Sequence, residues 1–146
     1  MKRLPILFGL LMSAAACTSQ TVMKQSQLPV APSLTVERFL QAANTRDLET
    51  KSRLFGNDDG PIGDLGSREE VKLRMNVIAE ILQHDDYEII SERSVPGAEF
   101  PSRRVGVDLV LPGGTTVRDV GFTLVLESDD RWLINVIEVI KITQAE

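Results

Sequence analysis

The chain has 146 residues, of which 42% are hydrophobic, 25% charged and 5% aromatic, with one Cys, one His and a net charge of −5 at pH 7. This composition fits one globular domain and excludes a disulfide scaffold, a zinc site built from this chain alone and a polytopic membrane protein, since each needs more Cys, His or long apolar runs. The acidic balance also argues against nucleic acid as a partner, because binding a phosphate backbone depends on a basic surface.

The N-terminus has the three parts of a secretory signal. Lys2 and Arg3 precede an apolar run over residues 4–12, and small residues then lead directly into Cys17. The segment 4–17 is shorter than the roughly 20 residues that a membrane-spanning helix requires. We therefore expect it to target the chain and then to be removed.

The run from Ser13 to Cys17, Ser-Ala-Ala-Ala-Cys, resembles the lipobox of bacterial lipoproteins, with Ala14 where that family most often has Leu. The resemblance implies cleavage before Cys17, diacylglycerol on its thiol and acylation of the new N-terminus, with palmitate as the expected fatty acid. Thr18, in place of the Asp that favours the inner membrane, implies the outer membrane facing the periplasm if the host is Gram-negative. The alternative is an ordinary Ala-x-Ala signal peptide cut beside a free cysteine.

The expected domain organisation is a signal peptide over 1–16, a lipidated Cys with a disordered tether over 17–33, and a folded domain over 34–146. The tether is rich in Thr, Ser and Gln, contains two prolines and shows no period. Cleavage also removes Lys2 and Arg3, which lowers the net charge from −5 to −7. We therefore expect the lipid, and not attraction to anionic headgroups, to hold the domain at the membrane.

Helical spacing of apolar residues marks the first part of the domain. Two short helices with a break near residues 44 and 45 are predicted by Val36, Phe39, Leu40 and Ala43 and then by Leu48, Ser52 and Phe55. The glycine-rich stretch 56–66 predicts a loop, and Ser67 with Glu70 forms a capping box for a third helix. The apolar stripe of that helix consists of Val71, Met75, Ile78 and Leu82, widened by Val77 and Ile81.

From Tyr87 onward the hydrophobic period changes from helical to two, which predicts strands. The four candidates cover residues 87–94, 104–111, 116–127 and 132–142, with turn signals at Pro112-Gly-Gly and Ser128-Asp-Asp-Arg. Helices followed by strands predict an α+β fold with three N-terminal helices packed on one face of a curved antiparallel four-stranded meander.

This arrangement resembles the nuclear transport factor 2-like superfamily, which includes ketosteroid isomerases and polyketide cyclases. The resemblance covers residues 34–142 and is most characteristic in the last strand, which reads Asp-Arg-Trp-Leu-Ile-Asn-Val-Ile-Glu over residues 130–138. It implies a cystatin-like cone whose open end often binds a small hydrophobic molecule, and often a dimer formed through the sheet. It does not specify an activity.

The predicted hairpin register defines an apolar face of the sheet. If Gly113 and Gly114 are the turn residues, Val107 lies opposite Val120 and Leu109 lies opposite Arg118. The face that the helices should cover then contains Val105, Val107, Leu109, Leu111, Val120, Phe122, Leu124 and Leu126. The same register, continued through the next turn, places Phe122 opposite Ile137 and adds Leu133, Asn135, Ile137 and Val139 to this face.

A ligand pocket is expected between this face, the third helix and the loop 56–66. Its candidate ligand contacts are Asn135, Phe122, Leu124 and Ile78. For Asn135 alone, a core amide with satisfied hydrogen bonds is the favoured role, and the ligand contact is the competing one.

The opposite face carries an apolar patch and a pair of carboxylates. The patch, formed by Trp132, Ile134, Val136 and Ile140, predicts a homodimer or an envelope protein partner. Asp108 is expected directly across from Asp119, where two carboxylates repel unless they are hydrated or share a proton in a dry cleft. A hydrated outer face with Arg104 nearby is the simpler interpretation.

Two classes of function are consistent with the sequence. The first is a noncatalytic, lipid-anchored module that binds a small apolar ligand or a protein. The second is a small isomerase, cyclase or hydrolase that uses Asp119, Asp108 or His84 as acid or base. A structural role is favoured for His84, because a cationic imidazole at the end of the third helix complements the helix dipole. We expect the first class, with no catalytic residue, metal or cofactor, since the titratable residues do not converge on the expected cavity.

Overall fold

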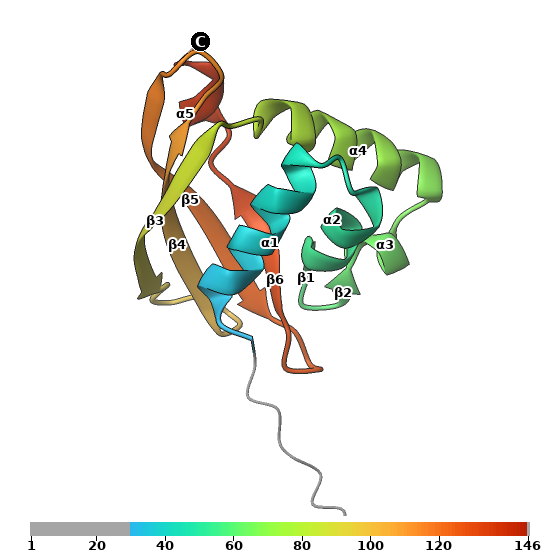
Figure 1. Cartoon of the computed structure of the whole chain (residues 1–146). Coiled ribbons are helices and arrows are strands. Elements are labelled where there is room, and N and C mark those ends of the chain that lie inside the picture. The colour runs from blue at the N-terminus through green and yellow to red at the C-terminus, as the bar shows by residue number, and fades with distance from the viewer. Residues whose placement is uncertain (1–29, 146) are drawn as a thin grey trace, which may run out of the picture.

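The computed structural model describes residues 30–145 (Figure 1). Its helices are α1 (Pro32–Asn44), α2 (Leu48–Leu54), α3 (Ile62–Leu65), α4 (Arg68–Ile81) and α5 (Ile140–Thr143). Its strands are β1 (Gly56–Asn57), β2 (Gly60–Pro61), β3 (Asp86–Ser94), β4 (Ser102–Val110), β5 (Thr116–Leu126) and β6 (Trp132–Ile137). The predicted α+β class and the four-stranded antiparallel sheet are confirmed. The predicted signal peptide, Cys17 and residues 18–29 of the predicted tether lie outside the described residues.

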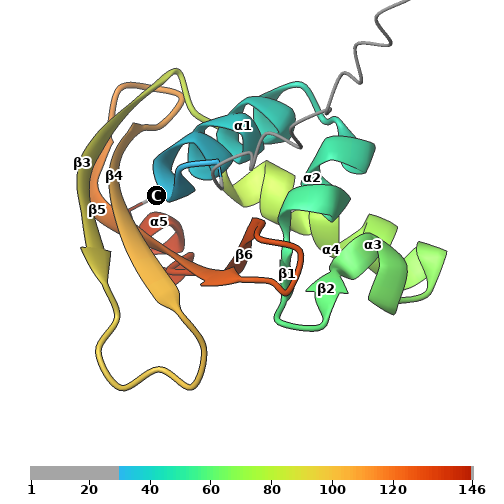
Figure 2. The same ribbon diagram turned by 90° about the horizontal axis from the view of Figure 1, so that it is seen from below.

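Helix α1 is the helix that lies on the sheet. It begins at Pro32, two residues before the predicted start of the domain, and the fixed φ of proline suits the first turn of a helix. Val36, Phe39 and Leu40 on one side of α1 are fully buried. Figure 2 shows α1 along one side of the sheet, where it contacts β3, β4 and β6.

Helix α4 packs against α1 and α2. Its N-terminus is capped as predicted, since Ser67 Oγ accepts the Glu70 N–H (3.4 Å) and donates to the Glu70 carboxylate (2.8 Å). Met75 is fully buried, as its place in the predicted stripe requires, whereas Val77 is 51% exposed. The predicted stripe is therefore too wide, because Val77 lies on the solvent side of the helix.

The stretch 56–66 is more ordered than the predicted loop, since it contains β1, β2 and α3. Phe55 forms a parallel bridge with Ile134 of β6, and Ile62 N–H donates to the Phe55 carbonyl (2.7 Å). These backbone contacts fix both ends of the β1–β2 hairpin beside the edge of the main sheet. The hairpin is thereby placed next to β6 and α4.

The main sheet has the strand order β3-β4-β5-β6. The predicted apolar face is confirmed by burial of its members Val105, Val107, Leu109, Leu111, Val120, Phe122 and Leu124, while Leu126 is half-buried. Alternating apolar residues on β4 and β5 thus form the sheet side of the core, and α1 forms the other side.

The predicted β4–β5 register is correct at one end and wrong near the turn. Val107 lies opposite Val120 as predicted, but Leu109 lies opposite Val117 and not Arg118. The extra residue forms a β-bulge in β5, where Asp119 adopts a left-handed backbone conformation (φ 50°). Asp108 and Asp119 are consequently not directly across from each other, which corrects the predicted carboxylate pair.

A second bulge changes the predicted β5–β6 register. Phe122 lies opposite Ile137 as predicted, but Leu124 lies opposite Ile134, so Asn135 is the extra residue. Strand β6 also ends at Ile137 and not at residue 142. The chain turns there into α5, which carries Ile142 into the core.

Candidate ligand-binding site

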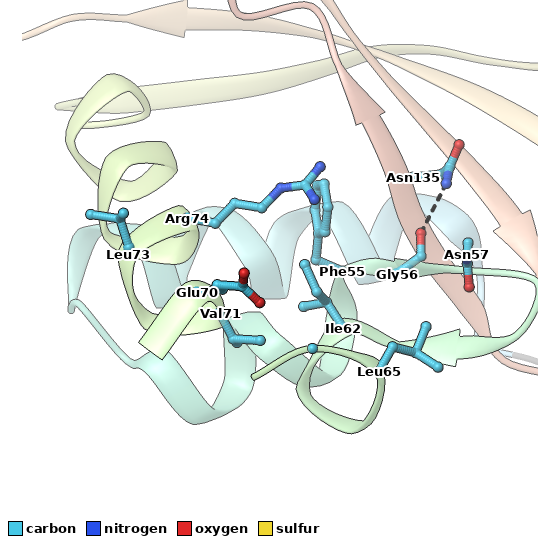
Figure 3. Close-up of a pocket in the computed structure, with 11 residues that line it drawn as sticks. Phe55, Gly56, Asn57, Ile62, Leu65, Glu70, Val71, Leu73, Arg74 and Asn135 are labelled. Carbon is cyan, nitrogen blue, oxygen red and sulfur yellow. Dashed lines mark hydrogen bonds between the residues drawn. The ribbon is translucent and has the colours of Figure 1, made fainter. Parts of the chain in front are cut away.

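A pocket of about 690 Å³ opens between the β1–β2 hairpin, α3, α4 and β6 (Figure 3). This volume lies within the range of roughly 300–1,000 Å³ that is typical of sites for small molecules. Its apolar lining consists of Phe55, Ile62, Leu65, Val71 and Leu73, and its polar lining includes Asn57, Glu70, Arg74 and Asn135. The pocket lies at the loop 56–66 and the third helix, where one was expected, but the main sheet contributes Asn135 to its lining and not the apolar face.

The apolar lining combines a fixed floor with an exposed rim. Phe55 and Val71 are buried, and the Phe55 ring is held by the ring of Phe39, with centroids 6.1 Å apart. Leu65 and Leu73 are 51% and 69% exposed. Covering these two side chains removes apolar surface from water, which favours a ligand with an apolar part.

Arg74 is the cation of the pocket. Its Cζ lies 5.1 Å from the centroid of the Phe55 ring, within the range of a cation–π contact. Among residues 30–145, no carboxylate comes within 4.0 Å of its guanidinium nitrogens. Glu70, one turn earlier on α4, instead accepts the hydroxyl of Ser67. The N–H donors of the Arg74 guanidinium can therefore form hydrogen bonds with a bound ligand.

Asn135 lies at the opposite wall of the pocket because the β6 bulge releases it from the strand ladder. Its Nδ2 donates to the Gly56 carbonyl (3.0 Å), and Figure 3 shows this bond between β6 and the hairpin. Asn135 is an exposed residue, so its predicted place in the core is wrong, while its amide does make the structural hydrogen bond that was expected of it. It lines the pocket, as expected, and it also holds the hairpin in place.

Three predicted ligand contacts are placed elsewhere. Phe122 and Leu124 are fully buried in the core, and Ile78 is half-buried outside the pocket lining. The physical reason is that α1 fills the space above the sheet face with Val36, Phe39 and Leu40. The pocket lies instead at the end of that core, beside β6.

The predicted interface patch does not form a continuous surface. Ile134 is 0% exposed because the bulge at Asn135 turns it toward the core, and Trp132 is half-buried against the same core. Val136 is exposed on β6, whereas Ile140 is exposed on α5. The prediction of an outer apolar patch made by these four residues is therefore wrong.

None of the acid/base candidates lines the pocket. His84 is buried, with Nδ1 2.7 Å from the Leu82 carbonyl and Nε2 3.3 Å from Asn44 Nδ2. Asp108 accepts the backbone N–H of Asp119 (2.8 Å) and pairs with Arg118 (3.1 Å). His84 thus joins the end of α4 to the end of α1, and Asp108 stabilises the β5 bulge.

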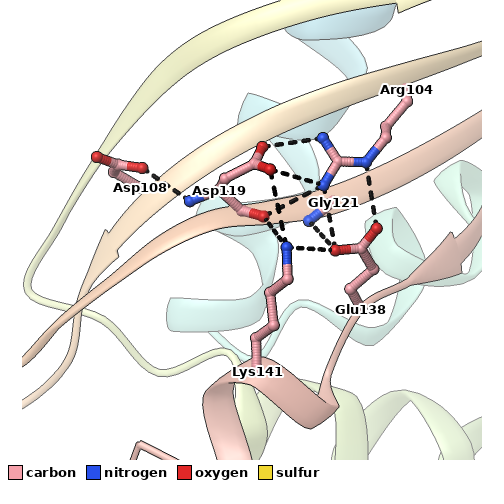
Figure 4. Close-up of polar contacts among 6 residues, drawn as sticks. All are labelled: Arg104, Asp108, Asp119, Gly121, Glu138 and Lys141. Atoms are coloured by element: carbon pink, nitrogen blue, oxygen red, sulfur yellow. Dashed lines mark hydrogen bonds and ion pairs between the residues drawn. The ribbon is translucent and has the colours of Figure 1, made fainter.

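Arg104 organises a separate ion network on the outer face of the sheet (Figure 4). Its guanidinium donates to both carboxylate oxygens of Asp119 (2.9 and 3.2 Å), to the Asp119 carbonyl (3.2 Å) and to both carboxylate oxygens of Glu138 (3.1 Å each). Lys141 donates to the Asp119 carbonyl (2.6 Å) and pairs with Glu138 (2.8 Å). The network joins β4, β5 and the segment that leads into α5.

These contacts shift the pKa values of the network in the direction expected for stable ion pairs. Hydrogen bonds from Arg104 and then from Lys141 hold the pKa of Glu138 at about 2. The Arg104 hydrogen bonds also lower the pKa of Asp119, and the two carboxylates raise the pKa of Arg104, with Asp119 making the larger contribution. All three groups are therefore ionised at neutral pH.

A pair of glycines makes room for this network. Gly106 and Gly121 lie directly opposite each other on β4 and β5. A Cβ at Gly121 would overlap the Glu138 carboxylate and come within 2.6 Å of Arg104 Nε, and one at Gly106 would overlap the Asp119 carboxylate. The two glycines thus form a shallow depression in the sheet face that the charged groups fill.

Within residues 30–145, no group of three or more His, Cys, Asp or Glu side chains is arranged to hold a metal ion. The same part of the chain contains no helix with the length and apolarity needed to cross a bilayer. A comparison with known protein families finds no match, and neither does a comparison with curated proteins. Function must therefore be inferred from the geometry and charge of the pocket.

Proposed function

We propose that the protein is a lipid-anchored lipoprotein of the cell envelope whose domain binds a small, mainly apolar molecule without transforming it. The observation that carries this proposal is the pocket itself. It combines a buried aromatic floor at Phe55, exposed leucines at its rim and an arginine with no carboxylate partner among the described residues. Such a combination is typical of small-molecule sites, which are largely apolar with a few polar groups that orient the ligand.

The order of the elements supports a nuclear transport factor 2-like architecture for the domain. Two helices, a short hairpin and two further helices precede the four-stranded antiparallel sheet. We propose that the sheet and helices form the cone of that superfamily and that the pocket corresponds to its open end. The pocket lies at one end of the core, next to the hairpin, which is consistent with that assignment.

The anchoring part of the proposal rests on the sequence around Cys17. Residues 18–31 separate Cys17 from the first helix, and at roughly 3 Å per residue this length reaches up to about 40 Å. A protein with Cys17→Ala is expected to leave the membrane fraction for the soluble one when cells are fractionated. Retention in the membrane fraction would contradict lipid anchoring and would leave the binding proposal intact.

A pair of matched variants on α4 tests the binding site. Leu73 and Val77 are both exposed apolar residues one turn apart, but only Leu73 lines the pocket. We expect Leu73→Ser to weaken binding of the neutral fluorescent probe N-phenyl-1-naphthylamine by about fivefold, because part of the apolar contact is lost. Val77→Ser should leave the affinity unchanged. Equal affinities of both variants and the original protein, or no probe binding at all, would contradict this site.

A further inference from the structure

We infer that the pocket takes an amphipathic monocarboxylate, with its apolar chain over Phe55 and its carboxylate on Arg74. This inference rests on the proposed function and specifies the chemical class of the ligand. It is drawn from the juxtaposition of a guanidinium that has no acidic partner with an apolar pocket, in the part of the chain that the structure describes.

The head group follows from the state of Arg74. A guanidinium presents several N–H donors in a planar fork that matches the two oxygens of a carboxylate. On the outer sheet face, the guanidinium of Arg104 donates its hydrogen bonds to two carboxylates and a carbonyl. At the pocket, the contact of Arg74 with Phe55 positions the guanidinium but satisfies none of its N–H donors. Because no carboxylate of residues 30–145 lies within 4.0 Å of this guanidinium, a ligand carboxylate can accept its hydrogen bonds.

The apolar tail follows from the rest of the lining. Phe55 and Val71 are buried, Ile62 is half-buried, and Leu65 and Leu73 at the rim are largely in water. Figure 3 shows Arg74 extending from α4 toward the Phe55 ring, with Ile62 and Val71 nearby and Leu73 at the outer edge, pointing away from the ring. A ligand that reaches Arg74 through this pocket therefore passes apolar surface, which requires a hydrocarbon part next to its charged group.

Glu70 limits the charge of the head group. It lines the same pocket one turn before Arg74, and its carboxylate is held by the Ser67 hydroxyl. One negative charge on the ligand is balanced by Arg74, but a second one would face Glu70 without a further cation in the described lining. The pocket should therefore prefer a carboxylate to a phosphate monoester with the same chain.

The test compares head groups on one tail. The protein is made from residue 17 onward with Cys17→Ser, which keeps every described helix and strand. Decanoate, decanol, decylammonium and decyl phosphate compete with N-phenyl-1-naphthylamine at pH 7.5. We expect decanoate to bind about tenfold more tightly than decanol, decyl phosphate to bind more weakly than decanoate, and decylammonium to bind most weakly, as one charge-assisted pair predicts.

Variants on α4 test whether the preference for decanoate over decanol depends on Arg74. Arg74→Gln should bring the affinity for decanoate down to that for decanol, while the decanol affinity changes little. Lys72→Gln removes the same charge from an exposed position outside the lining and should leave the preference intact. Glu70→Gln should tighten decanoate binding about threefold, because it removes a nearby like charge.

The outcomes separate this inference from the proposed function. Three results would contradict a monocarboxylate ligand: equal binding of decanoate and decanol, tightest binding of decylammonium, or an unchanged preference in Arg74→Gln. None of them would contradict the proposed binding pocket. Tighter binding of decyl phosphate than of decanoate would overturn the charge limit set by Glu70. Failure of all four compounds to displace the probe, or of the probe to bind, would overturn the proposed site itself.

Discussion

Arg104 on the sheet and Arg74 at the pocket show two different uses of the same side chain. The Arg104 side chain is 12% exposed and is bound by Asp119 and Glu138, while Arg74 is exposed, lies over the face of Phe55 and has no ion pair within residues 30–145. A charged group whose hydrogen-bond donors are bound by acceptors of the protein contributes to stability. A charged group that the protein holds in place without binding its donors is available to a ligand.

The largest expected effect separates the two arginines by stability. Arg104→Gln leaves Asp119 and Glu138 close together without their shared cation, and should lower the free energy of unfolding by about 2–3 kcal/mol. Arg74→Gln should change it by less than about 0.5 kcal/mol, because the side chain is exposed. Urea unfolding followed by circular dichroism measures both. Similar losses in the two variants would remove the distinction between them.

A substitution beneath the network should cost slightly less. Gly121→Ala introduces a Cβ that overlaps Glu138 and crowds Arg104, and should lower the free energy of unfolding by about 2 kcal/mol. In an Arg104→Gln background the same change should cost less than half as much, since one of the crowded groups is gone. A double-mutant cycle in urea provides the comparison. If the two changes in the free energy of unfolding simply added, Gly121 would be needed for the conformation of the strand and not for the ion network.

The network also predicts a response to acid. Because the pKa of Glu138 is lowered from 4.5 to about 2, its contribution is complete above pH 4.5 and is lost as the pH falls toward 2. Allowing for a carboxylate side chain that is about one-third exposed, the loss should be about 1–2 kcal/mol. Arg104→Gln should flatten this dependence, whereas Arg74→Gln should not. Parallel pH profiles for all three proteins would contradict the assignment.

A third cation, Lys51, should have the smallest effect and the opposite sign. It is fully buried, its Nζ donates to the Met75 carbonyl (3.1 Å), and burial lowers its pKa. Lys51→Met should therefore raise the free energy of unfolding by about 1 kcal/mol at pH 7. The gain should shrink at alkaline pH, as the folded original protein loses the proton before the unfolded chain does. A loss of stability in thermal unfolding at pH 7 would show that the ammonium is needed.

The sequence was sufficient for α1, α2, α4 and the four strands of the main sheet, but not for the short elements β1, β2, α3 and α5 or for the two bulges. Alternation on β4 and β5 predicted the buried face, including Val107 and Val120, because one side of each strand is polar. Strand β6 is apolar on both sides, so alternation could not decide whether Leu133 or Ile134 faces the helix-covered side of the sheet. The extra residue at Asn135 buries Ile134 and directs the amide to the hairpin. The burial of Ile134, which was predicted for the outer patch, follows from that insertion, whereas Ile140 leaves the patch because β6 ends at Ile137.

The position of the pocket was more predictable than its chemistry. The glycine-rich stretch 56–66 beside the third helix and Asn135 were expected at the site, and both lie there. Phe55 and Arg74 were missed because Phe55 was assigned to a helical stripe and Arg74 lies outside the stripe of α4. The available signal was Leu73, an apolar residue next to Arg74 and outside that stripe. Which cation lacks a partner depends on tertiary contacts, which helical spacing does not contain.

The most direct test of the central claim is a nuclear magnetic resonance titration of the isotopically labelled protein with decanoate. We expect the largest shifts at the Nε–H of Arg74 and at the amides of Gly56 and Ile62, while the Nε–H of Arg104 stays unchanged. Shifts centred on Arg104 or scattered over the surface without saturation would contradict a ligand site at Arg74.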